Sequence, residues 1–458
     1  MMKPSNERAA APPAAPASTR WQRIHGSVRS SLAWGRIYRA TSYLKSALWT
    51  VPLIAIALEL LIAPVLREID AWLRWRFAGL DAPGAQALYQ TVVTLTLSFI
   101  VFTFGSLLVA IQVAGGQLTP RIIATTLLRD NVVRYSVGLF VFTLIFAVSG
   151  LNRQGPSVDE LSTLITGILG IACIADFLFL IDYAARLLRP VSVVTRIADQ
   201  GVAMIRSVYP EPTAALTAEA AAPYVRAQSP VREVEHQGTS AIVLAVDLST
   251  LVALAGRHDG MIEFAPQVGD FVAAEEPLFT LYGGAGAIDD RELRSTVAFG
   301  SERTLEQDPI FAFRVIVDIA LKALSPAIND PTTAVLALDQ VHRLLRTVGK
   351  RKLRGEVILD AGGQPRLVFR TPNWEDYVHI ACREIRACGA DNLQVARRMR
   401  AMLEELQRTL PEHRRAALLE ELGLLNRAIE SNFQYPEDLA LARIADSQGL
   451  GASSSERP

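Results

Sequence analysis

The stretch LYQTVVTLTLSFIVFTFGSLLVAIQVA, residues 88–114, contains no Asp, Glu, Lys or Arg in 27 positions. An α-helix of this length would extend ~40 Å at ~1.5 Å per residue, and the hydrocarbon core of a bilayer is ~30 Å thick. An uncharged apolar run of this kind predicts a membrane-spanning helix. We therefore expect an integral membrane protein.

One face of this predicted helix carries small and polar side chains. Thr91, Ser98, Gly105 and Gln112 recur every seven residues and Thr94 lies beside them, so all five fall on one stripe. Such a stripe is typical of close helix packing, because lipid supplies no hydrophobic force for helix association. It also suits the wall of a water-filled or substrate-conducting path. The sequence leaves both interpretations open.

Three further apolar segments flank the central one. We predict spans at about residues 47–66, 135–152 and 161–181, which gives four transmembrane helices within residues 47–189. Residues 1–20 are rich in Ala and Pro, and we expect a disordered tail. Residues 21–46 combine apolar positions at helical spacing with several arginines, which predicts an amphipathic segment at the membrane surface. An organellar transit peptide is the alternative interpretation of this basic segment.

Lys and Arg in the short loops predict the orientation of these spans. With the N-terminus inside, thirteen basic residues lie on the inner side and four on the outer side. Because cytoplasmic loops carry the excess of Lys and Arg, we expect both termini in the cytoplasm of a multi-pass protein of the bacterial inner membrane.

Two acidic residues lie inside predicted spans. Glu59 is the only charged residue of the first span, and Asp176 lies in the fourth. An intramembrane carboxyl group is a functional-site hypothesis that needs a partner, and hydroxyls of the central helix (Thr91, Thr94, Ser98) are the partners that we expect for Glu59. The alternative is a glutamate that reaches the outer surface or contacts another subunit.

The remainder of the chain has the composition of a soluble domain. The whole sequence holds 46 basic and 46 acidic residues, but those after Arg206 comprise 27 basic and 35 acidic ones. An acidic surface argues against nucleic acid as a partner, because phosphate binding needs basic groups. Three cysteines and six dispersed histidines without ligand spacing predict neither disulfides nor a metal site.

We divide this remainder by its patterns. Residues 190–206 continue the helical period of the fourth span past a predicted kink at Pro190, which predicts a rigid helical arm into the cytosol. Residues 207–230 are rich in Pro and Ala, as in a linker. Alternating strands then predict a small β-rich module over residues 231–305. A mainly helical domain with one β-hairpin is expected over residues 306–446, and a disordered tail over residues 447–458. The fold class is thus four transmembrane helices followed by a cytosolic α+β domain.

A distinctive stretch, RTLEQDPIFAFRVIVDIALKALSPAINDPTTAVLALDQVHRLL, covers residues 303–345. Its two helical periods are separated by Asp330 and Pro331, a capping residue before a first-turn proline, which predicts a helical hairpin. Lys322, Ser325 and Asp330 also suggest a hydrolytic cluster, but no base is placed to activate the serine. Structural capping is the interpretation that we favour.

The same residues carry a resemblance to a family. The patterns RT..QDP and IALKALSPAINDPTTAV, with GGQLTPRII after the central helix, resemble the bacterial membrane proteins of domain of unknown function 2254 over residues 45–435. The residues that carry the motif are Arg303, Asp308, Ser325, Asn329, Asp330 and Pro331. The resemblance implies a fold and a membrane location without an established activity, so no catalytic residue carries over.

Two functional hypotheses remain. In the first, the helices assemble as a homo-oligomeric channel or transporter-like unit that the cytosolic domain regulates. In the second, they anchor a sensing or interaction module without a transport pathway. Four spans exceed what an anchor needs, which favours the first. The sequence shows no nucleophile with its base, no phosphate loop and no cofactor motif, so it predicts neither an enzyme nor a cofactor, and the ligand stays unknown.

Overall fold

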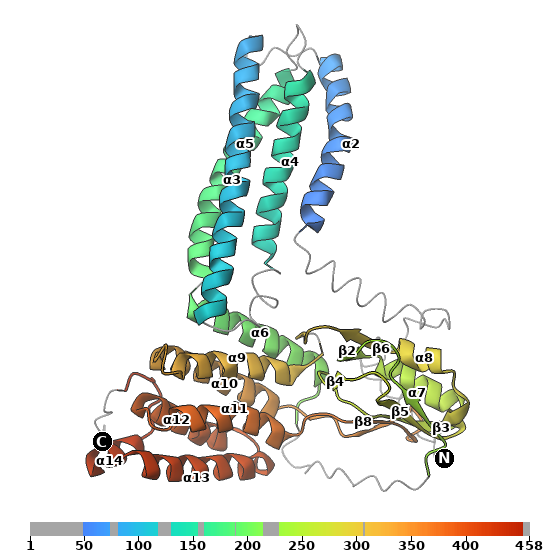
Figure 1. The fold of residues 1–458 in the computed structure, drawn as a ribbon, viewed down its shortest axis with the longest axis vertical. Helices are drawn as coiled ribbons and strands as arrows, with labels where there is room; N and C mark the ends of the chain where they lie inside the picture. Colours follow the sequence, from blue (N-terminus) through green and yellow to red (C-terminus); the bar gives the residue numbers. More distant parts are fainter. Residues whose placement is uncertain are drawn as a thin grey trace, which may run out of the picture.

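The computed structural model describes residues 49–73, 81–117, 130–153, 160–187, 189–213, 229–305 and 307–451. The predicted tail over residues 1–20, the amphipathic segment over 21–46 and most of the linker lie outside these ranges. Two parts are visible in Figure 1, a bundle of four long helices and a globular part beneath it. The bundle consists of α2 (Thr50–Leu73), α3 (Ala82–Gln117), α4 (Asn131–Arg153) and α5 (Glu160–Leu187).

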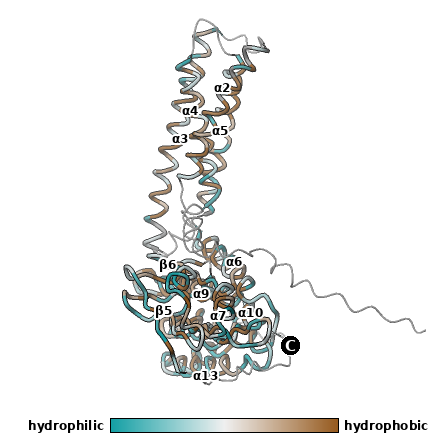
Figure 2. Tube along the Cα trace, turned by 90° about the vertical axis from the view of Figure 1, so that its right-hand side faces the viewer, coloured by the Kyte–Doolittle hydropathy of each residue, from teal (hydrophilic) through white to brown (hydrophobic). Residues whose placement is uncertain are grey.

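Three helices of the described chain are long and apolar enough to cross a membrane: α3, α4 and α5. The apolar part of α2, Thr50–Leu66, is shorter than they are. Figure 2 shows hydrophobic residues over most of the bundle and a mixture of hydrophilic and hydrophobic residues in the globular part. A bundle with this composition fits a bilayer, and three of the four predicted spans meet the criteria of length and hydropathy.

Helix α4 packs against each of the other three helices of the bundle, α2, α3 and α5. Small residues allow the close approach. A Cβ atom added to Gly138 would lie 2.6 Å from Val51 of α2, and one added to Gly150 would lie 2.3 Å from Tyr89 of α3. Packing through glycine is the usual means of helix association in lipid.

The helix after the bundle begins at Pro190, where a kink was predicted, but it lies on the globular part rather than forming an extended arm. α5 ends at Leu187 and α6 (Pro190–Val208) is a separate helix that lies across the top of the globular part (Figure 1). Arg189 is extended and Pro190 begins α6, which breaks the helix between them. The apolar face of α6 then packs on the globular part, where a Cβ atom at Gly201 would lie 2.8 Å from Ala312.

The helical layer of the globular part begins with the hairpin of α9 (Pro309–Leu324) and α10 (Pro331–Gly349). α11 (Trp374–Gly389) and α12 (Leu393–Thr409) follow, and α13 (Arg415–Asn432) and α14 (Pro436–Ala442) end the layer. One apolar core joins these helices with α6 and reaches Ala110 near the end of α3. The bundle is therefore attached to the globular part by packing as well as by the chain.

Two sheets form the β-rich portion. Its elements in chain order are β1 (Arg232–Glu235), β2 (Ala241–Val246), α7 (Leu248–Arg257), β3 (Gly260–Phe264), β4 (Phe271–Val272), β5 (Pro277–Gly283), α8 (Asp290–Ser295) and β6 (Val297–Gly300). The strand order is β1-β5-β3-β8-β7 in one sheet and β4-β2-β6 in the other, and the two sheets share an apolar core.

The larger sheet takes two strands from the region predicted as mainly helical. β7 (Val357–Leu359) and β8 (Pro365–Phe369) form the predicted hairpin, and β8 pairs in parallel with β3, with Leu367 opposite Ile262. The larger sheet is consequently completed by strands from outside residues 231–305.

The C-terminal segment differs from the prediction of a disordered tail from residue 447. Residues up to Gly451 are described, and the backbone N–H groups of Gly449 and Gly451 donate to Asp446. The Gly451 carbonyl accepts a hydrogen bond of 3.1 Å from Arg397 of α12. These polar contacts fix a segment that has no apolar period.

Candidate functional site

Glu59 is a fully buried acidic residue of the bundle. Its side chain has no exposed surface, and neither carboxylate oxygen has a hydrogen-bond partner among the described residues. The predicted partners do not contact it through hydrogen bonds, and the main packing of α2 is against α4 and α5. The hydroxyls of Thr91, Thr94 and Ser98 instead donate to carbonyl oxygens of α3 itself.

Polar side chains also meet between α4 and α5. Ser136 donates a hydrogen bond of 3.2 Å to Oδ1 of Asp176, whose Oδ2 has no hydrogen-bond partner among the described residues. Further along, the Cys173 thiol donates to the Thr143 hydroxyl at 3.3 Å. Ser136 and Thr143 are seven residues apart, so both lie on the same face of α4. Sequence analysis identified Asp176 but not its partners.

A third polar cluster lies at the base of the bundle. Asp130 caps α4 through the Val132 N–H, and its other oxygen accepts hydrogen bonds from Tyr183 at 2.6 Å and Arg196 at 2.5 Å. Arg196 also donates to the Tyr183 hydroxyl at 3.2 Å. This cluster connects α4, α5 and α6. This cluster was not predicted from the sequence, although the position of Asp130 directly before an apolar helix is a capping signal.

These three clusters follow α4 from one end toward the other. The contact of Gly138 with Val51 aligns α2 with α4, and both helices run away from the globular part (Figure 1). Glu59 therefore lies near the level of Phe146, about 24 Å along α4 from Asp130 at ~1.5 Å per residue. Carboxyl, hydroxyl and thiol groups thus occur at successive levels over most of the ~30 Å of a bilayer core. We call this set the α4 polar line: Glu59, Thr143, Cys173, Asp176, Ser136 and Asp130.

Apolar side chains surround the α4 polar line. Val137, Phe140 and Leu180 are buried with Cys173 in one cluster, and the Phe99 and Phe177 rings stack with centroids 4.2 Å apart. Such packing gives these polar groups apolar surroundings.

The polar stripe of α3 lies on the outside of the bundle. Thr91, Thr94, Ser98, Gly105 and Gln112 are all exposed. A Cβ atom added to Gly105 would meet nothing within 4 Å. Among the described residues, this stripe is not covered by another helix.

The first half of the family motif forms an ion pair at the start of α9. Asp308 accepts a hydrogen bond from the Phe311 N–H as the N-cap and lies 3.1 Å from Arg303. Burial raises the pKa of Asp308 to about 6, although Arg303 acts in the opposite direction. Gly269, with φ of +92°, passes so close to this pair that a Cβ atom would overlap the Arg303 guanidinium.

The second half of the motif forms the corner between α9 and α10. Asn329 has φ of +49°, and Ser325 ends α9 in an extended conformation. Asp330 accepts from the Thr333 N–H at 3.0 Å, and Pro331 begins α10. The Ser325 hydroxyl donates to the Lys322 carbonyl oxygen, so it is occupied in terminating the helix. The geometry of this corner is that of helix capping.

Within the described residues, no group of three or more His, Cys, Asp or Glu side chains is arranged to hold a metal ion. The profile of a family described as predicted membrane protein (DUF2254) matches residues 45–405. Uncharacterized proteins of Mycobacterium tuberculosis and Mycobacterium bovis are 26% identical to this chain over 446 residues, which cover 93% of it and 84% of each relative. No solved structure matches the chain.

Proposed function

We propose that this chain, which belongs to the DUF2254 family of predicted membrane proteins, carries protons across the bacterial inner membrane through its bundle. The observation that carries this proposal is the buried carboxyl group of Glu59, which has no hydrogen-bond partner among the described residues. An unpaired charge in hydrocarbon is costly, so the group is retained for a reason other than stability. The α4 polar line supplies further groups toward the base of the bundle.

In this proposal α2 is a fourth span. Its 24 residues are about 36 Å long at ~1.5 Å per residue, enough to cross a hydrocarbon core. The excess of Lys and Arg on one side supports a cytoplasmic location of both termini and of the globular part. Reporter fusions after Gly115 and at the C-terminus are expected to read cytoplasmic, and one at Pro83 external. An external C-terminus would contradict this topology.

The working unit is a homo-oligomer in the bilayer. The exposed stripe of α3 supports this, because small and polar side chains facing lipid are better satisfied against another helix. The bundle is the transporter- or channel-like unit, and the globular part regulates it. α6 is the link, since it follows α5, contacts Asp130 through Arg196 and packs on α9.

Proton flux into liposomes tests the proposal directly. The purified full chain is reconstituted into liposomes that enclose a pH-sensitive dye. Potassium efflux through valinomycin makes the lumen negative and so drives protons inward. Wild-type protein is expected to acidify the lumen at least tenfold faster than protein-free liposomes, and Glu59→Gln is expected to abolish this difference. Glu68→Gln is the matched control, because Glu68 is an exposed residue of the same helix.

Two results of this assay contradict the proposal. Wild-type liposomes that acidify no faster than empty ones would favour the second hypothesis, an anchored sensing or interaction module. The apolar cluster around Phe140 supports that alternative, because it separates the polar groups at successive levels. Equal proton flux with Glu59→Gln and with wild type would show that Glu59 is not part of the proton pathway.

A further inference from the structure

A pocket of about 330 Å³ lies where α6, the sheets and the helical layer of the globular part meet. Its walls come from the end of α6, the start of α7, the start of α9 and the segment after β8. Ligand pockets usually measure ~300–1,000 Å³, so this one suits a small molecule. It is separate from the α4 polar line of the bundle.

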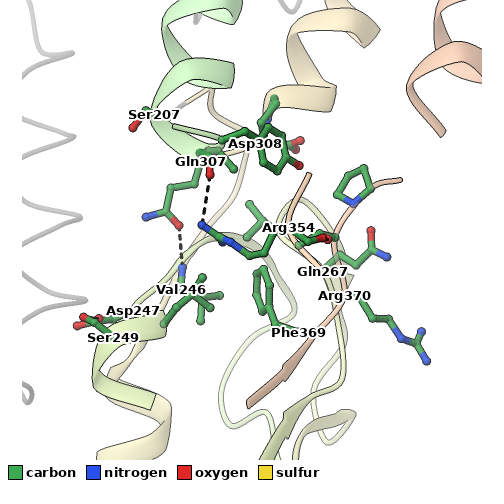
Figure 3. Close-up of a pocket in the computed structure, with 17 residues that line it drawn as sticks. Ser207, Val246, Asp247, Ser249, Gln267, Gln307, Asp308, Arg354, Phe369 and Arg370 are labelled. Carbon is green, nitrogen blue, oxygen red and sulfur yellow. Dashed lines mark hydrogen bonds between the residues drawn. The ribbon is translucent and has the colours of Figure 1, made fainter. Parts of the chain in front are cut away.

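Arg354 is the side chain that distinguishes this pocket. Its guanidinium donates one long hydrogen bond, of 3.4 Å, to the Val208 carbonyl oxygen, and no acidic residue of the described chain forms an ion pair with it. Desolvation lowers the pKa of Arg354 below its ordinary value. Figure 3 shows the side chain extending across the pocket, whereas Arg370 extends away from it.

The acidic residues of the pocket are already engaged by other groups. Asp308 is paired with Arg303 and caps α9. Asp247 accepts hydrogen bonds from the Ser249 hydroxyl at 2.7 Å and the Thr250 N–H at 3.1 Å. A half-buried arginine therefore faces the pocket without a carboxylate of its own, which favours an anion as its partner.

Neutral groups complete the walls. The Gln307 Oε1 atom accepts from the Val246 N–H at 3.1 Å, which leaves the amide NH₂ group of this side chain available. Phe369 provides an apolar surface beside Arg354 (Figure 3). A ligand with one anionic group and a carbon skeleton would match these surroundings.

We propose that this pocket binds a small organic anion whose phosphate or carboxylate group is held by Arg354. The planar guanidinium binds either group through two parallel hydrogen bonds, which a lysine cannot do. The ligand would contact the end of α6, the helix that leads to the bundle. The site goes beyond the proposed function and stands whether or not the bundle carries protons.

Calorimetry on the full chain in detergent tests this site. The probes are inorganic phosphate, pyrophosphate, adenosine monophosphate and citrate, each at the same ionic strength set with KCl. At least one is expected to bind with a Kd below about 1 mM. This Kd corresponds to a binding free energy of about −4 kcal/mol. The phosphorylated probes and citrate separate the two classes of anionic group.

Variants distinguish a ligand site from a structural contact. Arg354→Gln is expected to raise the Kd at least tenfold. Arg354→Lys keeps the charge and is the milder change for folding, so it is expected to raise the Kd by an intermediate factor. Arg427→Gln is the matched control, because Arg427 is an exposed residue of α13. If Arg354 only fixes the end of α6, both substitutions will lower the melting temperature without changing the Kd. That result, or failure of all four probes to bind, would overturn the proposal.

Discussion

Glu59 in the bundle and Glu421 in the globular part are equally buried, at 0% and 1% exposure, but their surroundings differ. Each oxygen of Glu421 accepts a hydrogen bond of 3.4 Å, one from Arg383 and one from Arg386. Neither oxygen of Glu59 accepts any from the described residues. Two arginines thus neutralise Glu421, whereas Glu59 has no such partner among the described residues.

The same contrast appears at a second pair of residues. In the globular part Asp339 accepts a hydrogen bond of 2.6 Å from the buried Arg398. In the bundle one oxygen of Asp176 has no partner among the described residues. Buried ion pairs cost desolvation and need good geometry, so a paired acid reports on fold stability. An unpaired acid in a bundle is a candidate for function, and the two kinds should respond differently to substitution.

Glu421→Ala should have the largest effect on stability. Removing one partner of a buried ion pair costs ~3–5 kcal/mol, and the partial exposure of both arginines favours the lower end of that range. Thermal or denaturant unfolding of the full chain measures it. Glu420→Ala, at an exposed neighbouring position, should cost less than about 0.5 kcal/mol. Equal stability of the two variants would mean that the pairing of Glu421 contributes nothing.

Asp308 is an intermediate case, since it is paired yet has its pKa raised to about 6 by burial. Between its ordinary pKa of 3.8 and about 6, the folded protein binds more protons at this group than the unfolded chain does. Its contribution to stability therefore falls as the pH rises through this window.

Asp308→Asn removes this titration and keeps a capping side chain. The stability of the variant relative to wild type should increase between pH 4 and 7 by at most about 3 kcal/mol, from ~1.4 kcal/mol per pKa unit. Melting curves of both proteins across this range measure the difference. A constant difference would show that the buried carboxyl does not titrate there.

Gly150→Ala tests the packing of the bundle. The new Cβ atom would overlap the Tyr89 ring, and overpacking of this kind costs ~1–3 kcal/mol. Gly105→Ala is the control, because nothing in the described chain lies within 4 Å of its added Cβ atom. Unfolding in detergent should separate the two variants. Should Gly105→Ala prove as destabilising as Gly150→Ala, the outer face of α3 is packed against another chain.

Local signals carried the successful predictions. Hydropathy located the long helices, and the sequence Asp330-Pro331 placed the corner of the α9–α10 hairpin, because capping depends on residues a few positions apart. Glu59 was identified as a candidate because it is the only charge in its apolar segment. Its lack of a hydrogen-bond partner depends on which helix packs beside it, and one sequence does not specify that.

The missed features depend on long-range contacts. Leu367 pairs with Ile262 across more than a hundred residues, and no local pattern names a strand's partner. The helix after Pro190 was predicted from its period, but burial of its apolar face on α9 and α10, which brings Arg196 to Asp130, could not be predicted from local patterns. The pocket around Arg354 is likewise assembled from six separate segments.

Asp330→Ala should have the smallest effect on the free energy of unfolding. Like Glu421, Asp330 is an acid whose oxygens both accept hydrogen bonds. Both oxygens of Asp330 are engaged, one by the Thr333 N–H at 3.0 Å and one by the Thr333 hydroxyl at 2.5 Å. Loss of an N-cap acceptor costs ~0.5–2 kcal/mol, which unfolding of the full chain can measure. Asp330→Asn should recover most of this stability, because an amide oxygen accepts from the same N–H group. Glu59→Gln is expected to show the opposite combination, with unfolding unchanged within about 1 kcal/mol and proton flux lost. If Asp330→Asn instead abolished flux at an unchanged melting temperature, Asp330 would belong with Glu59 among the functional acids rather than with Glu421 among the structural ones.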